Sequence, residues 1–167
     1  MDYKFIPAKY YFEGWKENPR LIVIHWIAGS YRGAIETFRQ GLSKASAHFI
    51  VSKEGLTTQM VKLTDRAWHA GISKTIFGEN ANNYSFGIEL EGPPSFVREK
   101  SWPLKQLVEA SNICIYLKEK YPSIEYVTDH SFISPGRKID VRGSTGKDID
   151  IFPWNDFVEL TGLKDLT

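Results

Sequence analysis

The sequence has little that would cross-link the chain or anchor it in a membrane. Cys114 is the single cysteine among 167 residues, so an internal disulfide is excluded. No apolar run approaches the ~18 residues of a membrane helix, and the first seven residues lack the apolar stretch and cleavage site of a secretory signal. We therefore expect a cytoplasmic protein without a membrane partner. Export by a route without a visible signal is the alternative.

An excess of charge of either sign is also missing. The 21 Lys and Arg residues nearly balance the 20 Asp and Glu residues, which gives a formal net charge of +1. This balance gives no reason to expect nucleic acid as a partner. Internal repeats, low-complexity tracts and linkers are likewise absent from the sequence. We expect residues 1–167 to form one domain, which acts as a monomer.

Short apolar segments with strand character are present along the chain. Residues 21–25 read as a buried strand that ends in a histidine. Residues 47–52 and 56–61 read as two strands joined by a turn at residues 53–55. Residues 86–91 alternate apolar and non-apolar side chains with the period of two that is typical of a strand.

Helical segments are interspersed with these strands. Residues 103–121 form the clearest predicted helix, which Pro122 would end, and shorter helices are predicted at residues 33–40 and 154–160. The inner stripe of the long helix is predicted at spacings of three, four and seven: Leu104, Leu107, Val108 and Ile115. The mixture predicts an α/β fold with a central mixed β-sheet flanked by helices.

Histidines are the first candidates for chemistry. The four are His25, His48, His69 and His130. A lone histidine beside a strand is more often structural than a ligand. His25 is different, because it closes a buried apolar strand, where open α/β sheets usually carry functional groups.

The strongest local cluster lies between residues 129 and 140. A Pro-Gly turn separates His130 from Lys138 and Asp140, and these two lie two residues apart, so an extended chain would point them to one face. With His25, the cluster offers two imidazoles and a carboxylate. This ligand set leaves a fourth position open, as in catalytic zinc sites at the ends of strands. A surface turn with a Lys–Asp pair is the alternative.

Other residues carry weaker signals. Glu89 lies inside an apolar strand, where a carboxylate is costly without a partner or a function. Glu91 faces the same way, but we interpret it as a solvated strand end. Trp68 and His69 could form a wall for a sugar or peptide, or simply core packing. Cys114 falls on the long helix and is interpreted as packing, which argues against a cysteine hydrolase.

Taken together, these motifs resemble the type 2 N-acetylmuramoyl-L-alanine amidase family, which includes peptidoglycan recognition proteins and phage amidase lysins. The resemblance runs over residues 21–154. It depends on five segments in combination: Ile-Val-Ile-His at 22–25, Ser-Ala-His at 46–48, Arg-Ala-Trp-His-Ala-Gly at 66–71, Gly-Ile-Glu-Leu-Glu-Gly at 87–92, and the cluster at 130–140.

The resemblance implies one Zn²⁺ ion, held by His25, His130 and Asp140. It also implies that Glu89 is the catalytic proton carrier and that Lys138 stabilises the transition state. The reaction would be hydrolysis of the amide between N-acetylmuramic acid and L-alanine in peptidoglycan or its fragments. The candidate substrate-binding residues are Trp26, Trp68, His69 and Arg137.

Two positions separate the branches of the family. Phage and animal members usually have a cysteine as the third ligand and a tyrosine before the histidine of the second strand. Here these places hold Asp140 and Ala47, which resembles the cytosolic branch that trims anhydromuramyl-peptides during cell-wall recycling. However, the stretch between residues 25 and 47 is short, and residues 141–150 depart from that branch's usual continuation. A lysin or toxin that acts on intact wall, or a binding module without activity, are therefore the alternatives.

Overall fold

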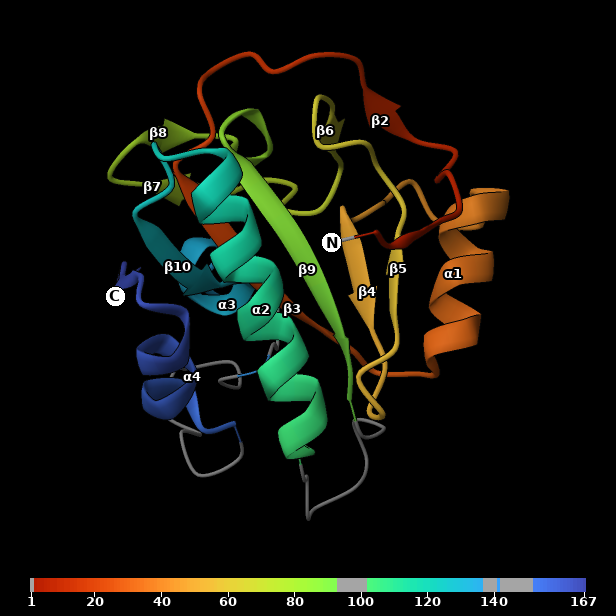
Figure 1. Ribbon diagram of the computed structural model, residues 1–167. Helices are drawn as coiled ribbons and strands as arrows, with labels where there is room; N and C mark the ends of the chain where they lie inside the picture. Colours follow the sequence, from red (N-terminus) through yellow and green to blue (C-terminus); the bar gives the residue numbers. More distant parts are fainter. Residues whose placement is uncertain (1, 93–101, 137–140, 142–151) are drawn as a thin grey trace.

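A seven-stranded mixed sheet forms the centre of the molecule (Figure 1). The computed structural model describes residues 2–92, 102–136, 141 and 152–167. Across the sheet the order is β1 (Lys4–Phe5), β5 (Thr57–Gln59), β4 (Phe49–Val51), β9 (Ser85–Glu91), β3 (Leu21–Ile27), β10 (Tyr126–Asp129) and β11 (Lys164–Asp165). Only the β4–β5 pair is antiparallel within this described sheet. The predicted mixed sheet is confirmed, with long β3 and β9 adjacent at its centre.

The strand predictions were right in position and less accurate in length. Strand β3 continues two residues beyond His25, to Ile27. The segment predicted at 47–52 contains the three-residue β4, and the segment predicted at 56–61 contains the three-residue β5. Between them Gly55 has a φ of 80°, a left-handed conformation that suits the predicted turn.

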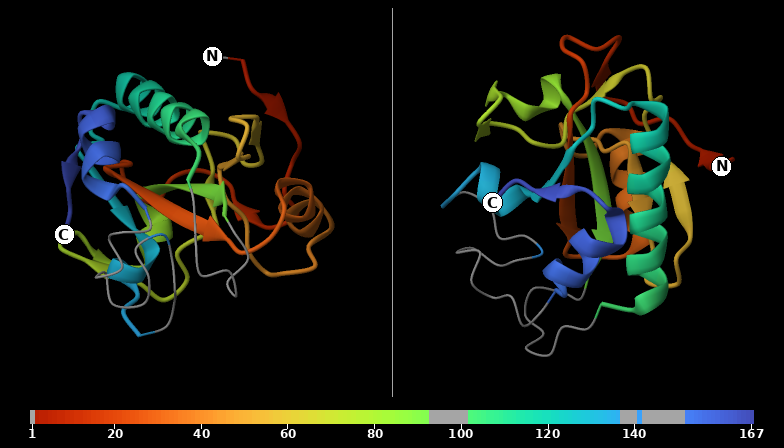
Figure 2. Two further views of the ribbon diagram at one scale, coloured as in Figure 1. Left: turned by 90° about the horizontal axis from the view of Figure 1, so that it is seen from below. Right: turned by 60° about the vertical axis from the view of Figure 1, so that its left-hand side comes forward.

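Two helices cover one face of the sheet (Figure 2). They are α2 (Leu104–Lys120) and α4 (Trp154–Thr161), which pack on each other and complete the largest core cluster with β3, β4 and β9. The predicted stripe of α2 was mostly wrong, because Leu104, Val108 and Ile115 are 69%, 41% and 39% exposed. The helix instead buries the following side chains: Gln106, Leu107, Ala110, Ser111, Ile113, Cys114 and Leu117.

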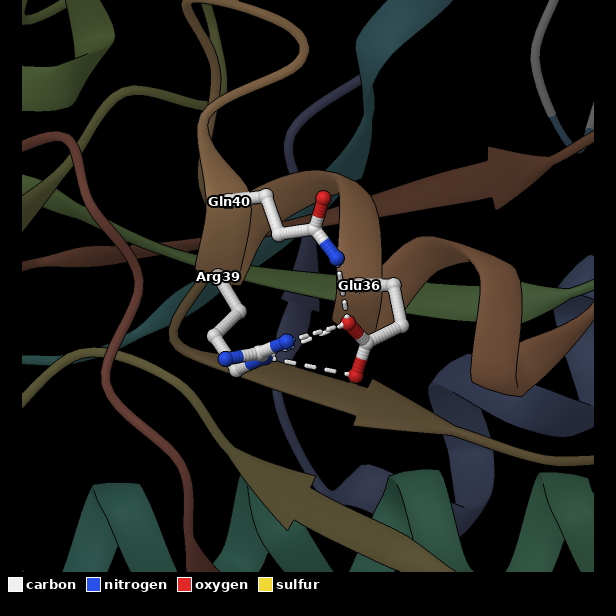
Figure 3. A network of polar contacts seen from close by, with 3 residues as sticks. All are labelled: Glu36, Arg39 and Gln40. Atoms are coloured by element: carbon white, nitrogen blue, oxygen red, sulfur yellow. Dashed lines mark hydrogen bonds and ion pairs between the residues drawn. The ribbon is translucent and has the colours of Figure 1, made fainter.

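The helix α1 (Tyr31–Gln40) packs on the face of β4 opposite α2 and begins two residues before the predicted start. Ser30 caps it by accepting a hydrogen bond from the backbone N–H of Gly33. Its outer face carries a network in which Glu36 accepts hydrogen bonds from Arg39 and Gln40 (Figure 3). Its inner face places Ala34, Ile35 and Phe38 against β4.

Short elements cover the other face of β3 and β9. They are the paired strands β2 (Tyr11–Phe12) and β6 (Arg66–Ala67), the paired strands β7 (Lys74–Thr75) and β8 (Gly78–Glu79), the 3-10 helix η1 (Ala81–Asn83) and the one-turn helix α3 (His130–Ile133). Leu21 and Val23 face this layer, and because side chains alternate along a strand, His25 shares that face. Among the described residues, no helix has the length and apolar character to cross a membrane.

Candidate metal and catalytic site

The central pair of strands positions His25 next to Glu89. In the parallel β3–β9 ladder these two residues are register partners, so their side chains leave the same face of the sheet. His25 is only 2% exposed, whereas Glu89 is partly exposed. Glu89 lines a groove of about 370 Å³ whose other walls come from residues 26–30 and the first turns of α1. A carboxylate therefore reaches an open groove beside a buried imidazole.

His130 reaches the same place from the next strand. Strand β10 pairs with β3, with Asp129 opposite Ile24, so the residue after β10 lies beside His25. Asp129 caps α3 by accepting hydrogen bonds from the backbone N–H of Phe132 and from the Ser131 hydroxyl. This cap holds His130 at the start of α3, where its Nδ1 lies 3.0 Å from the Nδ1 of His25.

The outer nitrogens of the two imidazoles have partners of their own. The Nε2 of His130 lies 3.0 Å from the carbonyl oxygen of Ala70, and a carbonyl can only accept a hydrogen bond. His130 therefore carries its proton on Nε2 when neutral, and Nδ1 presents a lone pair toward His25. The Nε2 of His25 lies 2.9 Å from the Nδ1 of His69.

His69 is buried behind His25 and makes no wall of the groove. It is 7% exposed, and its Nε2 lies 3.1 Å from the carbonyl oxygen of Ser85. Burial lowers the pKa of His69 well below its usual range. A Cβ at Gly87 would lie 2.4 Å from Cγ of His69, so only glycine lets the ring pack this closely on β9. Substrate contact by His69 stays a prediction, and its placement favours a supporting role.

His48, which the sequence left without a role, is a fully buried structural residue. Its Nδ1 accepts a hydrogen bond from the backbone N–H of Gly87 at 3.0 Å, and its Nε2 donates to the carbonyl oxygen of Asp65 at 3.1 Å. Burial lowers its pKa to about 4. The neutral ring thus ties β9 to the segment before β6, and it also supports Gly87 beneath His69.

Glu91 is not the solvated strand end that we predicted. It is half-buried, and its carboxylate accepts hydrogen bonds from the backbone N–H groups of Tyr31 at 2.9 Å and Lys53 at 3.1 Å. Tyr31 is the first residue of α1, where unpaired N–H groups and the helix dipole favour a negative charge. Glu91 therefore anchors α1 to the end of β9, while Glu89 faces the groove.

The two predicted tryptophans lie outside the His25–His130 pair. Trp26 follows His25 and points to the opposite face of β3, where its ring packs closely over Gly92 and the large core cluster, and it also lines the groove beside Glu89. Trp68 stacks on Tyr10, with ring centroids 5.4 Å apart and planes 22° apart, and lines a separate hollow. Substrate contact by either ring stays a prediction.

Cys114 is buried in α2, as the packing interpretation predicted. Burial raises the pKa of its thiol, which disfavours the nucleophilic thiolate.

Three predicted residues, Arg137, Lys138 and Asp140, lie outside the described residues. Within the described ranges, no group of three or more His, Cys, Asp or Glu side chains is arranged to hold a metal ion. The described part of the site is therefore a converging histidine pair with Glu89 beside it. The predicted third ligand follows in the chain shortly after α3.

Comparison with known proteins identifies the family of the chain. Residues 15–143 match the family described as N-acetylmuramoyl-L-alanine amidase. The chain belongs to this family. The predicted enzyme class is thereby confirmed, and the individual roles of the site residues stay predictions.

Relatives of this amidase family member cover most of its length. The 1,6-anhydro-N-acetylmuramyl-L-alanine amidase AmpD of Citrobacter freundii is 33% identical over 143 residues, which cover 74% of each chain. The AmpD of Haemophilus influenzae is 32% identical over 151 residues, which cover 75% of this chain and 78% of the relative. A crystal structure of an AmpD derivative superposes with a TM-score of 0.78 at 28% identity, over 95% of this chain and 93% of the other.

Proposed function

We propose that this amidase hydrolyses the amide bond between N-acetylmuramic acid, in its 1,6-anhydro form, and L-alanine in muropeptides. Two relatives named for this reaction, each matched over about three quarters of the chain, support the substrate class. The observation that carries the proposal is the convergence of the Nδ1 atoms of His25 and His130, with Glu89 on the same face one strand away.

The histidine pair has the chemistry that a zinc ion requires. At Zn–N distances of ~2.0–2.1 Å, two nitrogens of a tetrahedral site lie about 3.3 Å apart, close to the observed 3.0 Å between the Nδ1 atoms. The Nε2 of His130 donates a hydrogen bond to a backbone carbonyl oxygen. Histidines that bind a metal commonly have such a partner for their second ring nitrogen. We propose that His25, His130 and Asp140 hold the ion. When bound, the ion would supply a Lewis acid that polarises the scissile carbonyl and acidifies water.

Glu89 and Lys138 perform the remaining steps in this proposal. Glu89 removes a proton from the attacking water and returns it to the nitrogen of the leaving L-alanine, so that a carboxylic acid and an amine are released. Lys138, by resemblance, donates a hydrogen bond to the oxygen that gains negative charge on the attacked carbonyl. The groove of about 370 Å³ beside Glu89 would admit the substrate to this carboxylate.

The test compares two substrates and one matched variant. The zinc-loaded protein is incubated separately with anhydromuropeptide and with intact sacculi, and released peptide is followed by mass spectrometry. We expect cleavage of the anhydromuropeptide. Glu89→Gln keeps the shape of the side chain but not its basicity, so it should retain zinc and lose roughly 100- to 10,000-fold in kcat.

Cleavage of sacculi alone would replace the recycling substrate with intact wall. No cleavage of either substrate would leave a binding module. A cytoplasmic location belongs to the same proposal, and cell fractionation of the producing organism tests it separately.

A further inference from the structure

Three imidazoles in contact form a chain across the site, and the proposed metal needs only two of them as ligands. His69 contacts His25, and His25 faces His130, over sequence separations of 44 and 105 residues. Each end of this chain finishes on a backbone carbonyl oxygen, that of Ser85 at the His69 end and that of Ala70 at the His130 end. The order of donors and acceptors within the chain can therefore be assigned from its two ends.

The assignment begins at Ser85. Its carbonyl oxygen accepts only, so the Nε2 of His69 carries the proton. The Ser85 hydroxyl, 3.3 Å from that nitrogen, donates to the carbonyl of Ala81 and so can also accept. A neutral imidazole has one N–H, which makes the Nδ1 of His69 an acceptor. The nitrogen that faces it, Nε2 of His25, must then be a donor, and this leaves Nδ1 of His25 with its lone pair toward His130.

We propose that His69 is a positioning residue that sets the tautomer and orientation of His25 for metal binding. The inference rests on the proposed zinc site, in which His25 ligates through Nδ1. Ligating histidines usually donate their second N–H to a carboxylate, a carbonyl or water. Here a second imidazole takes that place, and it is itself aligned by a backbone carbonyl.

The contacts around His69 hold its ring in one orientation, with its Nδ1 toward His25. Its backbone N–H donates to the side-chain carbonyl of Asn82 at 3.1 Å, and its ring lies directly on Gly87, with no room for a Cβ there. The ring planes of His25 and His69 are 84° apart, so Nε2 of His25 meets the edge of the neighbouring ring. A side chain without an acceptor at the Nδ1 position would leave the Nε2–H of His25 without this partner.

Two variants of His69 that have the same shape as each other distinguish the loss of the hydrogen-bond acceptor from the loss of packing. In His69→Asn, the side-chain oxygen can occupy the place of Nδ1 and accept from His25. In His69→Leu, a side chain of the same branched shape has no acceptor. We expect His69→Leu to bind zinc more weakly, with a dissociation constant about 10- to 100-fold larger than that of the parent. The constant is measured by competition with a chelating dye. His69→Asn should stay within a few-fold of the parent, and thermal unfolding checks that both variants fold.

A second measurement does not need zinc or turnover. Long-range ¹H–¹⁵N correlation spectra of the zinc-free protein at pH 8, where unperturbed imidazoles are neutral, report which ring nitrogen carries each proton. We expect His25 to be protonated on Nε2 in the parent and in His69→Asn, and to lose this preference in His69→Leu.

A parent protein with the His25 proton on Nδ1 would overturn the proposal, as would equal zinc affinities for the two variants. If the parent binds no zinc at all, the proposed function fails, and the tautomer measurement still decides the role of His69. If His69→Leu does not fold, the tautomer of the parent and the affinity of His69→Asn decide it.

Discussion

The burial of His48 predicts that the free energy of unfolding falls at acid pH. The neutral ring uses both nitrogens, because Nδ1 accepts from Gly87 and Nε2 donates to Asp65. Protonation of Nδ1 would break the bond from Gly87 and place a charge in a site with no solvent exposure. Burial accordingly lowers the pKa of His48 from 6.5 to about 4.

The sign and size of the effect follow from linkage. Above pH 6.5 the ring is neutral in both states and makes no pH-dependent contribution. Below pH 6.5 the unfolded chain binds a proton that the folded chain cannot, so the free energy of unfolding falls until pH 4. A gap of about 2.5 pH units, at about 1.4 kcal/mol per unit, corresponds to about 3 kcal/mol of stability lost.

The assay compares the parent with His48→Asn by urea unfolding between pH 7 and pH 4. A chelator is present throughout, so that metal loss contributes to neither curve. Asparagine can still accept from the Gly87 N–H, while the carbonyl of Asp65 loses its donor, so the variant should be less stable by about 1–3 kcal/mol at pH 7. The difference in stability should then shrink as the pH falls, and change sign where it is smaller than about 3 kcal/mol at pH 7, because only the parent loses the His48 contribution.

Parallel curves from pH 7 to pH 4 would refute this reasoning. The comparison is needed because His69 is also buried with a lowered pKa and contributes to both curves. If His48→Asn is too unstable to measure, an NMR titration of His48 in the parent gives an independent answer. A value near 6.5 would then contradict the burial argument.

Three further predictions concern the site. His25→Ala should fold but lose stoichiometric zinc by elemental analysis, and full occupancy would remove His25 from the ligand set. Lys138→Ala should fold and keep zinc while kcat falls roughly 100- to 1,000-fold, and near-normal turnover would exclude its assigned role. Gly87→Ala should destabilise the protein by about 1–3 kcal/mol in urea unfolding and weaken zinc binding, because the new Cβ would displace the ring of His69. An unchanged midpoint and zinc affinity would show that the ring has room to move.

The sequence by itself determined the strands and helices that depend on local pattern. The period-two alternation of residues 86–91 predicted β9, and the prolines at 103 and 122 predicted the bounds of α2. These signals act between neighbouring residues, so they are readable without any knowledge of the fold. The motifs around His25 and Glu89 likewise predicted the amidase family, which the match over residues 15–143 confirmed.

Only the tertiary structure decided which helix faces are buried and which side-chain atoms form hydrogen bonds. Leu104 and Val108 of α2 are exposed because the helix packs on α4 and the sheet through a different face, which apolarity along one helix cannot reveal. Glu91 holds α1 because the end of β9 meets a helix that begins 60 residues earlier. The role of His69 depends on carbonyls and rings brought together from distant segments. Hydrogen bonds at such separations leave no local periodicity, and therefore only the folded chain shows them.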